Sequence, residues 1–281
     1  MFLKSSDSSF PPSLALVKPK VKGLLYKGNL EPELFENCVA VVGSRRITNY
    51  GRTVIEKIIP PLVDAGVTIV SGFMYGVDQE AHRVCLGNGG ATIAVLGWGI
   101  DWQVPEEDQK LYTQIEKEGL FLSEYGLDTK PQLWMFPQRN RIVAGLAKAT
   151  IVIEAAEKSG SLITANYALK FGRKLFSVPG PITSKVSMGC NQLIKEGKAQ
   201  ILTTANDILK ELNLKGTNIS PTRSDLEGEI AKLLANEALT VDELARIAKK
   251  NVESLAVELS MLQLKGDIVE RDGKYYINVN R

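Results

Sequence analysis

Residues 38–46 read Cys-Val-Ala-Val-Val-Gly-Ser-Arg-Arg, an apolar and β-branched run that ends in a glycine turn with two arginines. The run Val39–Val42 is short, and its apolar side chains predict a strand that is buried on both faces. The turn leads into the helical pattern of Gly51–Ala65. A strand, a glycine turn and a helix in this order predict the first unit of a Rossmann-like α/β core.

The same alternation of short apolar runs and helical patterns continues to about residue 212. Further strands are predicted at Thr68–Ser71, Thr92–Leu96, Phe121–Ser123, Thr150–Ile153, Leu175–Val178 and Gln200–Leu202. Further helices are predicted at Asp78–Leu86, Glu107–Glu118, Arg141–Ala147, Ile163–Phe171 and Asn191–Glu196. This pattern indicates an α/β fold with an extended, mostly parallel sheet that right-handed crossovers make doubly wound. In such sheets the ligand lies beyond the carboxyl ends of the strands.

The sequence pattern divides the chain into four parts. Residues 1–37 contain Ser-rich and Pro-rich stretches and predict a mobile start, followed by one short strand within residues 23–29. The core is expected over residues 38–212, and the polar, Gly- and Pro-containing residues 213–224 predict a linker. Residues 225–281 have the element order of a small winged-helix domain, namely helices at Leu226–Ala235, Thr240–Ala248 and Val252–Leu264 and a hairpin that turns at Asp272-Gly273.

Composition narrows the class of protein. The 281 residues are 44% hydrophobic and carry a formal net charge of +2, so any basic patch has to be local. The sequence contains no run of about 18 apolar residues, which is the length needed to span a membrane. Lys4 is not followed by an apolar signal segment, so we expect a cytoplasmic protein. The 3 cysteines are far apart and His82 is the sole histidine, which predicts no metal site and no ready catalytic triad.

The turn after the first strand has the properties of a phosphate-binding loop. Gly43 and Ser44 let a phosphate approach the backbone, the next helix offers unpaired N–H groups, and Arg45 and Arg46 add positive charge. A plain tight turn with two solvated arginines is the alternative. The turn has neither the GxGxxG pattern of dinucleotide-binding proteins nor a Walker A lysine, so we expect no cofactor.

The loop after the second strand contains two glycines and a helix-capping acid. Ser71, Gly72 and Gly76 precede Asp78, which suits either a ligand-facing turn or a simple turn with an N-cap. His82 lies one turn further along, and a structural, hydrogen-bonded role is the favoured interpretation for it.

Aromatic side chains occur in two later loops. Trp98 and Trp102 flank the glycine turn after the third strand, where they could either stack on bases or fill the core. Phe136 stands before a basic group that reads Arg139, Asn140 and Arg141. Bases stack on aromatic rings while guanidinium groups hold phosphates, so this stretch suits a nucleic-acid strand; packed aromatic residues and exposed arginines at a helix start are the alternative.

The loop before the next helix contains Ser159, Gly160 and Ser161, whose N–H and hydroxyl groups again suit a phosphate. A nucleophilic serine is the rival interpretation, but the GxSxG geometry is absent. Basic residues continue toward the following strand, namely Lys170, Arg173 and Lys174. Several phosphate-competent loops on one sheet edge exceed what a mononucleotide needs, and they predict a track for a backbone with several phosphates.

A series of motifs over about residues 24–212 resembles the DprA/Smf family of DNA-processing proteins. The motifs are Val39-Ala-Val-Val-Gly-Ser-Arg45, Ser71-Gly-x-x-x-Gly-Val-Asp78, Thr92-Ile-Ala-Val-Leu-Gly97, Phe136-Pro-x-Arg-Asn-Arg141, Ser159-Gly-Ser-Leu-Ile-Thr-Ala165 and Phe176-Ser-Val-Pro-Gly180. The resemblance implies a homodimer that binds single-stranded DNA, protects incoming strands in natural transformation and loads a RecA-type recombinase. It implies no catalytic activity. It also implies DNA contacts through Arg45, Phe136 and Arg173 with Lys174, and a pocket lined by residues 159–161.

The C-terminal part is less typical of a DNA reader. Residues 225–281 contain 8 Lys and Arg against 11 Asp and Glu, and the basic residues that cluster are Arg246, Lys249 and Lys250. The third predicted helix, which would read double-stranded DNA, carries Glu253 and Glu258. Regulation or protein contact is therefore the favoured role for this domain.

Two enzyme classes remain as alternatives. A nucleotide-binding hydrolase of a related Rossmann-like superfamily could use Asp78, Glu124 or Glu154, although the PGGxGTxxE signature of the phosphoribohydrolases is absent. A nicotinamide oxidoreductase is disfavoured because GxGxxG is absent.

Overall fold

The computed structural model describes residues 1–214, 229–234, 237–248, 250–264, 267–271 and 273–277. The chain forms two compact units, Met1–Thr217 and Asn218–Arg281, each with an apolar core of its own. The linker expected at residues 213–224 lies outside the described residues from 215 onward. None of the described helices is long and apolar enough to cross a bilayer.

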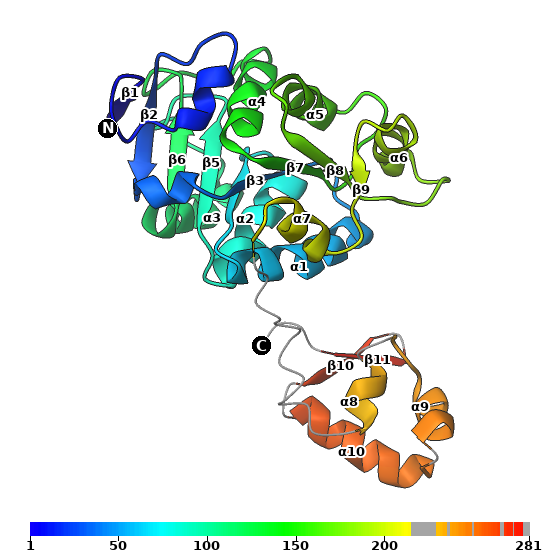
Figure 1. The fold of residues 1–281 in the computed structure, drawn as a ribbon. Helices are drawn as coiled ribbons and strands as arrows, with labels where there is room; N and C mark the ends of the chain where they lie inside the picture. Colours follow the sequence, from blue (N-terminus) through cyan, green and yellow to red (C-terminus); the bar gives the residue numbers. More distant parts are fainter. Residues whose placement is uncertain (215–228, 235–236, 249, 265–266, 272, 278–281) are drawn as a thin grey trace. The chain divides into compact units, whose positions relative to one another are not determined.

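The first unit is built on one sheet in the order β1-β2-β6-β5-β4-β3-β7-β8-β9 (Figure 1). Its strands are β1 (Phe2–Lys4), β2 (Gly23–Gly28), β3 (Cys38–Val42), β4 (Thr68–Ser71), β5 (Thr92–Leu96), β6 (Leu120–Ser123), β7 (Ala149–Val152), β8 (Lys174–Ser177) and β9 (Gln200–Ile201). Neighbours from β6 to β9 run parallel, and β1 and β2 add an antiparallel edge. The central strands are buried along their whole length, so both faces of the sheet need cover.

Helices cover both faces (Figure 1). One face carries α1 (Asn49–Asp64), α2 (Val77–Gly87), α3 (Glu106–Glu118) and α7 (Ala205–Glu211). The other face carries α4 (Met135–Leu146), α5 (Ser161–Lys170) and α6 (Met188–Lys195). The predicted doubly wound, Rossmann-like sheet is confirmed. Because β3 pairs with β4 on one side and β7 on the other, the strand order reverses between β3 and β7, where such sheets bind ligands.

The short strand predicted within residues 23–29 is confirmed as β2, which pairs with β6 of the core sheet. The residues before it also pack against the core, so the prediction of a mobile start is wrong. β1 pairs with β2, and a 3-10 helix, η1 (Pro12–Leu16), buries Leu14. Val17 packs on α4 where Gly145 has no side chain, since a Cβ at Gly145 would lie 2.2 Å from Val17 Cγ2. The apolar residues of this segment are spaced widely among Ser and Pro, which concealed them in the sequence.

α4 begins at Met135, six residues before the predicted Arg141. Pro137 lies in its first turn, where a missing N–H costs no hydrogen bond. Arg139, Asn140 and Arg141 therefore lie within the helix and point in directions about 100° apart. Because of these different directions, the three side chains do not form the single basic group that the sequence predicts.

The second unit contains α8 (Glu229–Leu234), α9 (Val241–Ala248), α10 (Val252–Leu264), β10 (Ile268–Arg271) and β11 (Lys274–Ile277). A capping box begins α9, because Thr240 N donates to Glu243 Oε2 at 2.8 Å and Glu243 N donates to Thr240 Oγ1 at 3.3 Å. Three helices and an antiparallel hairpin confirm the winged-helix order. Asp272 of the predicted turn and Lys249 of the predicted basic cluster lie outside the described residues.

Candidate functional site

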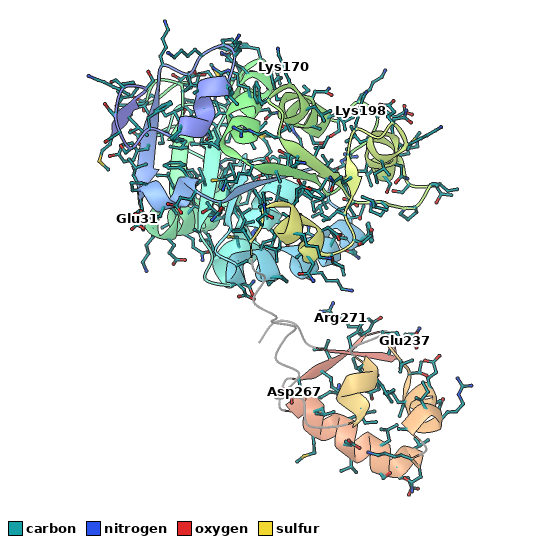
Figure 2. All side chains as sticks on the ribbon, in the orientation of Figure 1. Glu31, Lys170, Lys198, Glu237, Asp267 and Arg271 are labelled. Atoms are coloured by element: carbon teal, nitrogen blue, oxygen red, sulfur yellow. The ribbon has the colours of Figure 1, made fainter. Side chains whose placement is uncertain are left out.

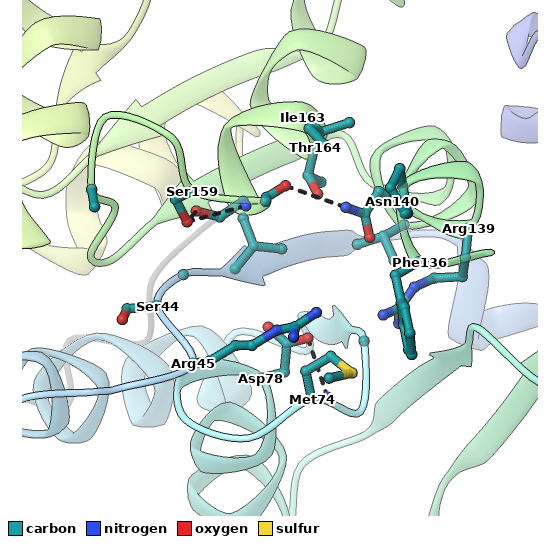
Figure 3. Close-up of a pocket in the computed structure, with 18 of the residues that line it drawn as sticks. Ser44, Arg45, Met74, Asp78, Phe136, Arg139, Asn140, Ser159, Ile163 and Thr164 are labelled. Carbon is teal, nitrogen blue, oxygen red and sulfur yellow. Dashed lines mark hydrogen bonds between the residues drawn. The ribbon is translucent and has the colours of Figure 1, made fainter. Parts of the chain in front are cut away.

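A pocket of about 580 Å³ lies where the loops after β3, β4 and β7 meet the first turns of α4 and α5 (Figure 3). Its lining includes most of the residues that the sequence analysis selected, namely Gly43, Ser44, Arg45, Arg46, Gly72, Phe136, Arg139, Asn140, Ser159, Gly160 and Ser161. The topological rule for α/β sheets thus located the pocket correctly.

The pocket lining has an excess of positive charge. Its basic side chains are Arg45, Arg46, Arg139 and Lys158, and its one acidic side chain is Asp78. Lys158 was not selected from the sequence, because a single lysine in a loop is ordinarily a solvated charge. A concave surface with this charge balance concentrates anions.

The loop after β3 presents its arginines to solvent. Ser44 Oγ closes the turn, accepting from Arg46 N and donating to Arg46 O at 3.0 Å each. The Arg45 guanidinium lies 5.6 Å from the centre of the Phe136 ring, within cation–π range. Figure 3 shows Arg45 reaching across the pocket above Asp78 toward Phe136 and Arg139. Arg45 lines the pocket, and no ion pair is recorded for it among the described residues.

Gly76 allows the loop after β4 to touch the loop after β3. Its φ is +83°, and a Cβ there would lie 2.3 Å from Ser44 O and 2.7 Å from Arg45 C. Val77 N donates to Ser44 O at 3.1 Å across the same contact. Gly76 does not line the pocket, but it fixes the backbone that carries Arg45.

Asp78 and Arg139 both lie beside Gly72, where a Cβ would be 2.3 Å from both Asp78 Oδ2 and Arg139 Nη1. The Arg139 side chain is buried, and its guanidinium donates to Val95 O. Desolvation raises the pKa of Asp78 to about 6, although Arg139 and the Met74 N–H favour the carboxylate. Burial likewise lowers the pKa of Arg139, against the attraction of Asp78. Arg139 therefore contributes positive charge from the floor of the pocket, and its guanidinium is not exposed for direct contact with a ligand.

The loop before α5 offers hydroxyl and N–H groups to the pocket. Ser159 Oγ lies 2.7 Å from Ser161 Oγ and accepts from Ser161 N at 3.3 Å. Asn140 Nδ2 donates to Gly160 O at 3.4 Å, which ties this loop to α4. The residues 159–161 stand at the N-terminus of α5, where the helix dipole favours an anion.

Arg141 and Ser71 are structural residues, which corrects their selection for the site. Arg141 is 1% exposed, and its Nη2 donates to both carboxylate oxygens of Glu124 at 2.8 and 2.7 Å. Its Nε donates to Pro19 O at 3.2 Å and thereby holds the N-terminal segment. Ser71 Oγ is buried and donates to Val41 O at 2.6 Å, joining β4 to β3.

The basic residues around β8 also lie apart from the pocket. Arg173 Nη2 donates to Ser13 O at 3.0 Å and to Gly145 O at 3.1 Å, so this side chain binds the N-terminal segment to α4. Lys174 pairs with Glu211 at 2.6 Å. Lys170 lies at the end of α5 remote from residues 159–161 (Figure 2). The structure therefore does not bring these three residues together with Arg45 and Phe136.

Two further side chains for which the sequence leaves a binding role open, Trp98 and His82, belong to the interior. Trp98 is 7% exposed and packs edge-on against Phe136, which decides its role in favour of the core. His82 is buried between Thr92 Oγ1 and Gly72 O, each at 2.7 Å, as expected for a structural histidine. Desolvation lowers the pKa of His82 to about 4.

The sequence offers Glu154 as an acid for a hydrolase, but its contacts show a structural role. Its Oε2 accepts from Thr48 N at 3.0 Å and its Oε1 accepts from Thr48 Oγ1, while Thr48 Oγ1 accepts from Gly51 N at 3.2 Å as the N-cap of α1. Glu154 thereby holds the loop that carries Arg45. No signal in the sequence joins residues 48 and 154, which meet only in the fold.

Comparison with known families gives two matches along the chain. Residues 1–213 match the family model of DNA recombination-mediator protein A, and residues 217–274 match that of the DprA winged helix domain. DNA processing protein DprA of Streptococcus pneumoniae is 43% identical over 73% of this chain and 72% of its own length. Protein Smf of Escherichia coli is 36% identical over 96% of this chain and 75% of its own.

Two solved structures have the same fold and a similar sequence. DNA processing protein A of Streptococcus pneumoniae superposes with a TM-score of 0.71 at 42% identity, over 75% of this chain and 74% of that one. DNA processing protein A of Helicobacter pylori superposes with a TM-score of 0.68 at 30% identity, over 76% of this chain and 96% of that one. The Helicobacter pylori structure was solved for the way that protein binds single-stranded DNA.

Proposed function

Because the chain belongs to the DNA recombination-mediator protein A family, the DprA/Smf family of DNA-processing proteins, we propose that its pocket binds single-stranded DNA. The observation that carries this proposal is the pocket itself, which is lined by four basic side chains, by the hydroxyl-bearing loop of residues 159–161 and by Phe136. Cations and N–H groups suit phosphates, and an aromatic ring stacks on any base. Such contacts carry little sequence information, so the binding is sequence-independent.

The strand would be held without chemical change. Among the described residues, Ser159 and Ser161 hydrogen-bond to each other, Ser44 Oγ donates to Arg46 O, and His82 is buried between Thr92 and Gly72, so none of these three serines is paired with the histidine. The protein would act in the cytoplasm as a homodimer that protects incoming strands in natural transformation and loads a RecA-type recombinase on them. The homodimer is supported by the exposed apolar side chains of Ile182 and Met188 on the α6 side of the first unit. Sedimentation of the full chain, alone and with a recombinase on a DNA strand, tests both associations.

Titration of a labelled oligothymidylate strand and of a duplex at two salt concentrations tests the binding proposal. We expect the strand to bind more tightly than the duplex, because a duplex hides the base faces that Phe136 would contact. The logarithm of the association constant should fall with the logarithm of salt, by about 0.7 for each phosphate contact. Equal affinity for strand and duplex, or binding that salt does not weaken, would contradict the proposal.

Strand affinity is expected to rise as the pH falls from 7.5 to 5.5. The pKa of Asp78 is about 6, so its carboxyl group is ionised at the upper pH and largely protonated at the lower one. Loss of this negative charge beside the phosphates would favour binding by about 1 kcal/mol, or roughly fivefold. His82 stays neutral over this range, since its pKa is about 4. Titrating oligothymidylate across the range measures the effect.

The Asp78→Asn variant is the matched control. It keeps the shape of the pocket and an acceptor for the Met74 N–H, so it should bind as tightly at pH 7.5 as the parent does at pH 5.5. A pH dependence that persists unchanged in this variant would assign the effect to another group.

The alternative is a nucleotide hydrolase, and Asp78 is the observation that favours it, since an acid with a raised pKa in a pocket can serve as a general acid. Incubation with nucleotides and assay for free base separates the two functions.

A further inference from the structure

The segment before α4 exposes two large apolar side chains beside the pocket. Leu133 lines the pocket and is 85% exposed, and Trp134, the N-cap residue of α4, is 58% exposed. Phe136 and Pro137, which follow Trp134 in the sequence, also line the pocket. Trp134 therefore lies in a segment whose neighbouring residues line the pocket, without being part of the lining itself.

One aromatic contact restrains the Trp134 ring from one side. Its ring packs edge-on against Tyr125, with centroids 6.0 Å apart and an interplanar angle of 81°. Tyr125 is itself fixed, because its hydroxyl donates to Met135 O at 3.1 Å. An edge contact of this kind restrains the indole and leaves part of its surface to solvent.

Trp134 differs in this from the other tryptophans of the chain. Trp98 is buried, and Trp102 is partly buried against the same apolar cluster. Removing an indole from water is favourable, so an exposed indole that packing restrains is suited to a partner that covers it. The neighbouring pocket has a surplus of positive charge, which attracts a polyanion, so we expect the partner that covers the indole to be a nucleic-acid strand.

We propose that Trp134 stacks on a base of the bound strand just outside the pocket, as a second aromatic platform after Phe136. This proposal rests on the proposed function and adds to it the path that the bound strand takes over the protein surface. The strand would leave the phosphate-binding loops past α4, over Leu133 and Trp134, and would not run toward Lys170, Arg173 and Lys174. A protein partner that covers the same indole is the competing outcome.

Tryptophan fluorescence tests this stacking directly. Addition of oligothymidylate should quench the emission of the parent protein, and Trp134→Phe and Trp134→Ala should abolish the quenching. Trp134→Ala should also lose roughly 5- to 150-fold in strand affinity, which is the equivalent of 1–3 kcal/mol for one stacked base. Trp134→Phe should recover part of that affinity, because a smaller ring still stacks. Trp102→Phe is the matched control and should keep both the quenching and the affinity.

A strand with abasic residues in place of every base separates stacking from charge. It should bind the parent protein and Trp134→Ala equally, because the phosphates remain and the bases do not. If oligothymidylate binds the parent but quenching and affinity survive in Trp134→Ala, the stacking proposal is overturned while the proposed function stands. If the parent binds no strand at all, the proposed function fails first. If Trp134→Ala does not fold, the quenching and affinity of Trp134→Phe decide.

Discussion

Replacing Arg45 with alanine is expected to weaken the binding of an oligothymidylate strand by about ten- to a hundredfold. A hydrogen bond to a charged group contributes about 1.5–3 kcal/mol, and Arg45 faces the pocket with its N–H groups free of an ion pair in the described residues. The change also removes the contact with the Phe136 ring, which holds the guanidinium over the pocket. A mobility-shift titration at fixed salt measures the loss.

The salt dependence shows whether this loss arises at a phosphate. If Arg45 neutralises one phosphate, the slope of log affinity against log salt should fall by about 0.7 in Arg45→Ala, and Arg45→Lys should keep most of the slope. Arg83→Ala removes the same charge from an exposed arginine of α2 that pairs with Glu80, and it should bind as the parent does. Equal losses in Arg45→Ala and Arg83→Ala would mean that only net charge matters.

The sheet and the place of the pocket could be predicted from the sequence. The strands are short apolar runs and the helices between them are longer than ten residues in most cases, so period and length separate the two. β4 and β5 have the bounds that the pattern predicts, and β3 begins one residue earlier. Once the alternation is recognised, the carboxyl edge of the sheet follows from topology, and the loops at Gly43, Gly72 and Ser159 follow with it.

The orientation of the arginines could not be predicted in the same way. An arginine is usually exposed, and its burial depends on a partner that the sequence does not show. Both arginines lie within α4 and are buried, Arg139 beside Asp78 and Arg141 in an ion pair with Glu124. A helix start misplaced by six residues was enough to assign both to the surface.

The same reason accounts for the residues that the sequence analysis missed. The sequence offers Glu154 as an acid for a hydrolase, but its pairing with Thr48 spans 106 residues. A long-range pair of this kind depends on how the elements pack, which no local pattern encodes. Lys158 directly precedes Ser159, but a single lysine in a loop is ordinarily a solvated charge, and only the fold shows that it lines the pocket.

Glu124→Leu is expected to lower the free energy of unfolding by about 3 kcal/mol, since it leaves the Arg141 guanidinium buried without a carboxylate. For a unit of this size the loss corresponds to a decrease in Tm of roughly 6–12 °C. Thermal and urea denaturation measure it, and the N-terminal segment should become sensitive to proteolysis, because Arg141 also holds Pro19 O. The double variant Glu124→Leu with Arg141→Met should regain most of the stability, because an apolar pair needs no compensating charge. Strand affinity of the folded double variant should equal that of the parent, which distinguishes Arg141 from Arg45; a loss of affinity as large as that of Arg45→Ala would return Arg141 to the binding site.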